Sequence, residues 1–176
     1  MKKAITITLL FVFSILNFAF TGCGIYSFKE ANPLPADIKT VHIPFIENQA
    51  PYRNPQLSPN LTDRLQQKIV RQTKLTPTQN RDAANLSIVG TVTDYSVTTS
   101  GVSTTGGQSQ SSINRLTITV QLAITDNVRN TTKEHTVTRS FDFPARQTLQ
   151  QAEATLLDEM VRNLSDEIFN RIFSDW

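Results

Sequence analysis

The sequence predicts an α+β fold: a two-layer sandwich in which two helices pack on a mostly antiparallel four-stranded sheet, in the order β-α-β-β-β-α. Two observations predict it. Four segments place apolar residues at every second position, which is typical of strands with one dry face. Two other segments repeat apolar residues every three or four positions, which indicates amphipathic helices.

The first strand and the first helix lie in the N-terminal half. Residues 40–46 alternate, but Pro44 has no amide hydrogen to donate, so we expect an edge strand or one with a local break. Ser58 and Pro59 predict the start of a helix, because serine is a good cap and proline suits the first turn. The helix should end near Thr73, with an apolar stripe of Leu61, Leu65 and Ile69.

Three strands follow in succession. The first contains Leu86, Ile88 and Val92, with Gly90 as a bulge or a point of close approach. The second, residues 116–125, alternates apolar residues with Thr, Gln and Ala, so one face should be dry and the other wet. The third has a dry face of Val137, Phe141 and Phe143. The opposite sheet face would be lined by Thr, Gln and Ser.

The last predicted element is the longest, a helix over residues 149–173. Its apolar stripe is regular and wide, which indicates core packing and not a cofactor site. The stripe contains Ala152, Leu156, Met160, Leu164, Ile168 and Ile172.

The N-terminus indicates a bacterial lipoprotein. Lys2 and Lys3 precede an apolar run that is too short to span a membrane, and the run ends at Thr21-Gly22-Cys23. Cys23 is the only cysteine. We therefore expect residues 1–22 to be a signal peptide and Cys23 to carry a covalent lipid. The alternative is an uncleaved membrane anchor.

Location and charge follow from that cleavage. Gly24 and the residues after it carry no acidic signal for inner-membrane retention or surface export, which predicts the periplasmic side of the outer membrane. The chain has 17 Lys and Arg against 15 Asp and Glu. Removal of Lys2 and Lys3 leaves 15 against 15, so nothing indicates nucleic-acid binding.

Residues 98–112 consist almost wholly of Ser, Thr, Gly and Gln. The simplest interpretation is a floppy hairpin tip. The functional alternative is a long polar finger that is retained because it reaches a polar protein wall.

No catalytic or metal-binding pattern is recognisable. His42 and His135 belong to no ligand motif, and no thiol remains for a metal, so we expect neither catalysis nor a metal nor a cofactor beyond the lipid. Antiparallel topology would bring Arg115 and Arg146 to one edge of the sheet, with Arg129 and Lys133 at the opposite edge. The two arginines either bind an anion, since a guanidinium suits phosphate, or are ordinary surface charge.

The order of these elements after Gly22-Cys23-Gly24, with Arg139-Ser140-Phe141 closing the last strand, resembles the LPS-assembly lipoprotein family (LptE-like). The resemblance covers essentially the whole mature chain, in which residues 38–176 would form a single domain after a lipidated linker of residues 23–37. It implies a partner, an LptD-type outer-membrane β-barrel that the protein plugs and helps assemble. It also implies contact with lipopolysaccharide, for which the matching regions offer Arg115 and Arg146.

Two other classes of function stay open on the sequence. One is a lipid-anchored module of another envelope machine, similar to curli-secretion-type lipoproteins, which usually form rings. The other is a periplasmic hydrolase, which no residue set supports. The sequence departs from the family pattern in one respect, because residues 98–112 contain no basic residue. Plugging of the barrel is therefore better supported than binding of lipopolysaccharide by this segment.

Overall fold

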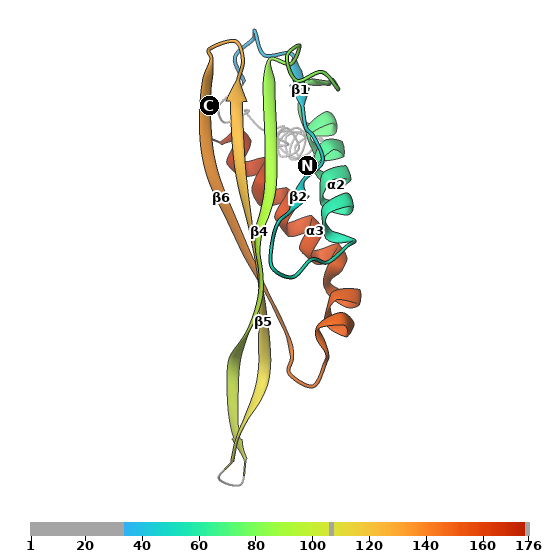
Figure 1. The fold of residues 1–176 in the computed structure, drawn as a ribbon, viewed down its shortest axis with the longest axis vertical. Helices are drawn as coiled ribbons and strands as arrows, with labels where there is room; N and C mark the ends of the chain where they lie inside the picture. Colours follow the sequence, from blue (N-terminus) through green and yellow to red (C-terminus); the bar gives the residue numbers. More distant parts are fainter. Residues whose placement is uncertain (1–33, 106–107, 175–176) are drawn as a thin grey trace, which may run out of the picture. The chain divides into compact units, whose positions relative to one another are not determined.

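The computed structural model describes residues 34–105 and 108–174 (Figure 1). The predicted signal peptide, Cys23 and most of the linker lie outside these residues. The elements are β1 (Thr40–His42), β2 (Glu47–Asn48), α2 (Leu57–Gln72), β3 (Thr76–Pro77), β4 (Leu86–Thr105), β5 (Gln108–Asp126), β6 (Thr131–Pro144) and α3 (Leu149–Phe173).

The sheet is mixed and has six strands, so the prediction of four mostly antiparallel strands needs correction. Its order is β3-β1-β4-β5-β6, and β2 pairs with β4 beyond the end of β1. The β4–β5–β6 part is antiparallel, as predicted. The pairs β1–β3, β1–β4 and β2–β4 are parallel.

The predicted first strand is divided into two. β1 ends at His42 and β2 begins at Glu47, so the segment around Pro44 forms no strand. Proline lacks the amide hydrogen that a ladder needs, which accounts for the break. β3 was not predicted, because its two residues, Thr76 and Pro77, are too few to show a period.

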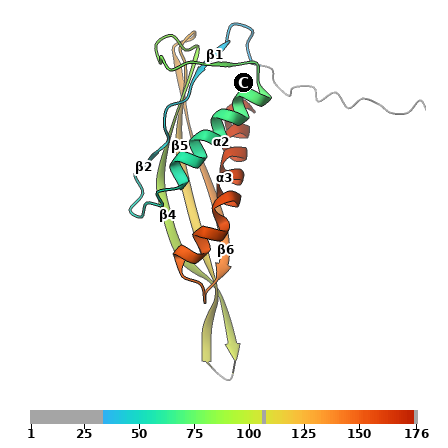
Figure 2. The same ribbon diagram turned by 90° about the vertical axis from the view of Figure 1, so that its right-hand side faces the viewer.

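Both helices cover the same face of the sheet (Figure 2), and the core lies between the two layers. The alternation in β5 and β6 places apolar residues beneath the helices, as the sequence indicated. A salt bridge of 2.8 Å joins Lys68 of α2 to Asp166 of α3. Fully buried core residues include Leu61, Leu65, Ile69, Leu86, Ile88, Leu116, Ile118, Met160 and Leu164.

The helix ends test the capping predictions. α3 spans Leu149–Phe173 as expected, and Thr148 caps it through reciprocal hydrogen bonds with Gln151. α2 begins at Leu57, so the prediction of Ser58 as its cap was wrong. Ser58 is buried in the first turn, and the turn before the helix is instead held by Asn54, whose Oδ1 accepts from the Gln56 amide at 2.8 Å.

Gly90 is a point of close approach and not a bulge. It pairs regularly with Leu122, whereas the register of β4 shifts between Val92 and Asp94. A Cβ at Gly90 would lie 3.3 Å from Cγ1 of Ile46, in the segment that leads into β2. Glycine therefore lets this segment pack closely against β4.

The β4–β5 hairpin is longer than predicted. Its strands pair from Leu86 and Asp126 to Thr105 and Gln108, so most of the segment expected to be a floppy tip continues the two strands. β6 pairs with β5 only as far as Pro144, opposite Ile113. Beyond that point the hairpin continues as a two-stranded ribbon (Figure 1). The region where this ribbon leaves the three-stranded part of the sheet, near Ile113 and Pro144, is called the base of the hairpin.

We expect Gly90→Leu to lower the free energy of unfolding by about 1–3 kcal/mol, because the new side chain must displace Ile46. Urea denaturation measures this change. Thr91→Leu is the matched control, since Thr91 is half-buried on the other face of β4. A loss of the same size in both variants would contradict the close-approach role of Gly90.

Candidate functional site: the polar sheet face and the base of the hairpin

The sheet face away from the helices is lined with hydroxyl groups. Three cross-strand pairs of β5 and β6 share hydrogen bonds of 3.0–3.1 Å. Because each hydroxyl has one donor and two acceptor positions, every pair keeps capacity for a further partner. The pairs are Thr117–Ser140, Thr119–Thr138 and Thr125–Thr132.

Arg115 lies on this face, near the base of the hairpin, and forms a two-pronged contact with Asp142. Its Nε and one terminal nitrogen donate to the two carboxylate oxygens at 2.7 and 2.8 Å. These hydrogen bonds lower the pKa of Asp142 and raise the pKa of Arg115. The guanidinium that the sequence singled out for an anion is therefore already bound to a carboxylate, although both side chains are exposed.

Arg146 lies at the same end of the sheet. It follows Pro144 in the turn between β6 and α3, two residues beyond the pair of Pro144 with Ile113. Its side chain is exposed and makes no hydrogen bond or ion pair with the described part of the chain. The register thus brings the two predicted arginines to one end, as expected, without joining their side chains.

A buried carboxylate fastens the base of the hairpin to the helices. Glu153, in the first turns of α3, accepts from the Tyr95 hydroxyl at 2.6 Å and from the Tyr52 hydroxyl at 3.0 Å. Tyr95 comes just after the register shift in β4, and Tyr52 precedes α2. Only 8% of Glu153 and 4% of Tyr95 are exposed.

The same cluster changes the titration of its tyrosines. Burial raises the pKa of Tyr95 far above its usual value, and the contact with Glu153 raises it further. Burial and Glu153 also raise the pKa of Tyr52. Both causes disfavour the phenolate, which would be poorly solvated in the partly buried site and would lie next to the Glu153 carboxylate.

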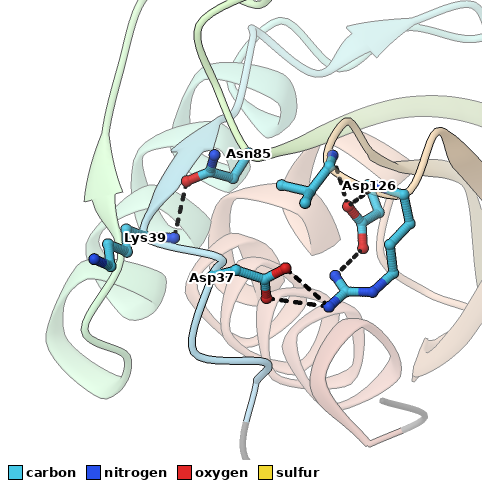
Figure 3. A network of polar contacts seen from close by, with 6 residues as sticks. Asp37, Lys39, Asn85 and Asp126 are labelled. Carbon is cyan, nitrogen blue, oxygen red and sulfur yellow. Dashed lines mark hydrogen bonds and ion pairs between the residues drawn. The ribbon is translucent and has the colours of Figure 1, made fainter.

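The opposite end of the sheet is held by a polar network (Figure 3). Arg129, in the β5–β6 turn, donates to Asp126 at 2.7 Å and to both oxygens of Asp37 at 3.0 and 3.1 Å. Oδ1 of Asn85 accepts from the Lys39 and Thr40 amides at 3.0 and 3.1 Å. The segment that leads into β1 is therefore fixed to the start of β4 and to the β5–β6 turn.

Neither histidine belongs to a visible metal site. Nδ1 of His42 lies 3.0 Å from the Thr78 carbonyl oxygen. His135 lies in β6, opposite Leu122. Within residues 34–105 and 108–174, no three His, Cys, Asp or Glu side chains are grouped so that they could hold a metal ion.

The family is decided by a family model that matches most of the chain. The model of the family described as "LptE: Lipopolysaccharide-assembly" matches residues 38–172, from just before β1 to the last turn of α3. The chain belongs to the LptE family. At family level these are non-enzymatic lipoproteins of lipopolysaccharide assembly that associate with LptD. No curated protein matches this chain.

Several solved structures are similar to this chain at low sequence identity. The hypothetical protein CT253 from Chlamydia trachomatis is 10% identical, with a TM-score of 0.53 over 78% of this chain and 98% of that chain. The rare lipoprotein B from Shewanella oneidensis is 14% identical, with a TM-score of 0.43 over 74% and 92%. An uncharacterized lipoprotein B from Nitrosomonas europaea is 15% identical, with a TM-score of 0.41 over 81% and 87%. The likeness to CT253 concerns the fold alone.

In this LptE-family chain, no helix of the described part is long and apolar enough to span a membrane.

The sequence analysis assigned no role to Glu153, Tyr95 or Tyr52. One signal for Glu153 was present: it directly follows Ala152 and lies three residues before Leu156, on the margin of the apolar stripe. The tyrosines gave no such signal, because each lies in a different, distant segment.

We expect Tyr95→Phe to lower the free energy of unfolding by about 1.5–3 kcal/mol at neutral pH, since Glu153 loses a hydrogen bond in a buried site. Tyr52→Phe should cost less, because 36% of Tyr52 is exposed. Urea denaturation of both variants measures the difference. A larger loss in Tyr52→Phe would contradict the dominant role of Tyr95.

The raised pKa of Tyr95 also predicts a pH dependence. Above about pH 10 the unfolded chain loses the Tyr95 proton and the folded protein keeps it, so stability should fall by about 1.4 kcal/mol per pH unit from this group. Below that pH this contribution is fully present. The Tyr95→Phe variant should therefore lose stability less steeply than the wild-type protein between about pH 10 and 11. Equal slopes in the two proteins would contradict the assignment.

Proposed function

We propose that this protein is a lipid-anchored plug and assembly partner of an LptD-type β-barrel, which assists delivery of lipopolysaccharide to the outer leaflet. It acts without catalysis. The observation that carries the proposal is the LptE family match across residues 38–172. The polar sheet face supports it independently.

The hydroxyl-lined face suits the interior of a large barrel. Side chains that face a barrel lumen are mostly polar, because the apolar residues of each strand face the lipid. The cross-strand pairs of β5 and β6 present hydroxyls that can exchange donor and acceptor roles with such a wall. The hairpin extends β4 and β5 with further residues that are mostly Ser, Thr and Gln.

The proposal includes the anchoring. Residues 1–22 are a signal peptide, and Cys23 carries a lipid such as palmitate that holds the protein on the periplasmic side of the outer membrane. Residues 23–37 are the tether, and residues 38–176 form one LptE-like domain. Supporting this are the apolar run, the small residues Thr21 and Gly22, and the single thiol.

Arg115 and Arg146 are the proposed contacts for lipopolysaccharide. Both are exposed at the base of the hairpin, and a guanidinium can donate two parallel hydrogen bonds to a phosphate. Arg146 can do so directly. Arg115 must either exchange Asp142 for the phosphate or use the nitrogen that Asp142 leaves unoccupied.

Co-purification tests the barrel partner. We expect the lipidated protein to recover an outer-membrane barrel, and we expect Thr119→Trp with Thr138→Trp to reduce recovery by about tenfold, because bulky rings on the polar face prevent close contact. The matched control is Asp63→Trp with Gln67→Trp on the exposed side of α2. Full recovery by the Thr119/Thr138 variant, with its circular dichroism unchanged, would refute docking through this face. Absence of a barrel in the wild-type sample would refute the partner.

Lipopolysaccharide binding tests the arginines. Arg115→Ala with Arg146→Ala should weaken binding by about three- to tenfold and leave barrel recovery unchanged, since it removes charge-assisted hydrogen bonds to phosphate. Arg64→Ala with Arg162→Ala, at exposed helix positions, controls for net charge. Equal binding by the two double variants would leave Arg115 and Arg146 as surface charge.

A further inference from the structure

We propose that one end of the sheet lies against the headgroups of an anionic lipid bilayer. This tether end consists of residues 37–40, 74–76, 80–85 and 126–131. The inference rests on the proposed lipidation of Cys23, because a tether can decide which end of a fold meets the membrane. It adds a membrane-contacting surface to the proposed function.

The chain enters the fold at a fixed place on the tether end. Ile38 donates its amide to the Pro35 carbonyl at 2.9 Å, and Asp37 is held by Arg129. Asn85 then fixes the next two amides and itself accepts from the Asn127 amide at 2.8 Å. These contacts join three segments that are far apart in the sequence (Figure 3).

The covalent reach of the tether favours this end. Leu34 lies 11 residues after Cys23 (34 − 23), so even a fully extended tether spans at most about 40 Å. From Asp126 to Ile113, β5 advances 13 residues (126 − 113), or about 43 Å. Presenting the base of the hairpin to the same membrane would require the tether to run fully stretched along the whole sheet. Presenting the tether end requires no such stretching.

The chemistry of the tether end also suits a bilayer surface. Val128 is 47% exposed at the β5–β6 turn, which is an unusual place for an aliphatic side chain. Thr76 donates to the Lys39 carbonyl, which brings the start of β3 beside Lys39, and Asn127 Nδ2 contacts the Arg81 carbonyl. Exposed basic side chains therefore surround the turn: Lys39, Lys74 and Arg81.

The acidic residues at this end are largely neutralised within the fold. Asp37 and Asp126 both pair with Arg129. Asp82, the third acid of the tether end, is exposed. The four cations Lys39, Lys74, Arg81 and Arg129 against three acids leave one net positive charge. An apolar tip flanked by Lys and Arg is the pattern by which peripheral proteins bind anionic headgroups.

Site-specific quenching tests the contact. Because Cys23 is the only native cysteine and its thiol is consumed by the lipid, Val128→Cys and Ile113→Cys each provide one free thiol for a fluorescent label. The labelled, lipidated proteins are reconstituted in vesicles of phosphatidylethanolamine and phosphatidylglycerol that carry a headgroup spin-label quencher. We expect the label at position 128 to be quenched about threefold more than the label at position 113. Equal quenching, or stronger quenching at position 113, would overturn the inference.

The same samples separate this inference from the proposed lipidation. Intact-mass measurement shows whether Cys23 carries the lipid, and the wild-type chain should take up no thiol label. A free Cys23 would overturn both the lipidation and the contact that rests on it. A lipidated Cys23 with equal quenching at the two positions would overturn the contact alone. Repetition with the barrel bound should preserve the difference; its loss would mean that the barrel covers this end.

Charge reversal tests the choice of an anionic surface. Lys39→Glu, Lys74→Glu and Arg81→Glu together should reduce quenching at Val128→Cys by about half in phosphatidylglycerol vesicles and leave it unchanged in phosphatidylcholine vesicles. The matched control is Arg53→Glu, Arg64→Glu and Arg162→Glu, three exposed positions outside the tether end. Equal quenching in the two triple variants would overturn the anionic partner.

Discussion

Burial of one face of the β4–β5–β6 sheet beneath α2 and α3 is the constraint on which the other features depend. Alternation along a strand means that an apolar residue committed to the core, such as Ile118, leaves its neighbours Thr117 and Thr119 on the opposite face. A slip of one residue would exchange the two sets, so the core fixes the register. The hydroxyl array is thus positioned as firmly as the core that it backs.

The two ends of this sheet differ in how they are held. At the tether end, the Arg129 side chain holds the Asp126 and Asp37 carboxylates, and Asn85 accepts hydrogen bonds from the Lys39 and Thr40 amides. At the hairpin end, Glu153 of α3 accepts hydrogen bonds from Tyr95 of β4 and from Tyr52, which precedes α2. The cluster lies just beyond the shift in β4, where the ladder itself is irregular. A short, partly buried hydrogen bond is most useful at such a place, because backbone pairing alone does not fix the direction of the ribbon.

The sequence reveals those parts of the fold in which one layer covers another. α3 and the β5–β6 pair were predicted correctly because helical and strand periods persist wherever a face is buried. The sequence predicted a floppy tip for the ribbon beyond Ile113, since residues 98–112 are almost all Ser, Thr, Gly and Gln and show no apolar period. The sequence did not predict the Glu153 cluster for another reason. Its three members are separated by up to 101 positions, and only the tertiary fold brings them together. Topology alone places the two arginines at the same end of the sheet, whereas the contact of Arg115 with Asp142 depends on the exact register of β5 and β6.

That pairing bears on how an anion would be recognised. Both members of the Arg115–Asp142 pair are exposed in the isolated chain, where water and salt screen them. Insertion into a barrel would remove water and strengthen the pair, because the attraction between charges grows as the surrounding dielectric falls. A phosphate would then have to displace a carboxylate that is held more tightly than before. Arg146 meets no such competitor in the described part of the chain, so it is the better placed of the two to make the first contact with an anionic ligand.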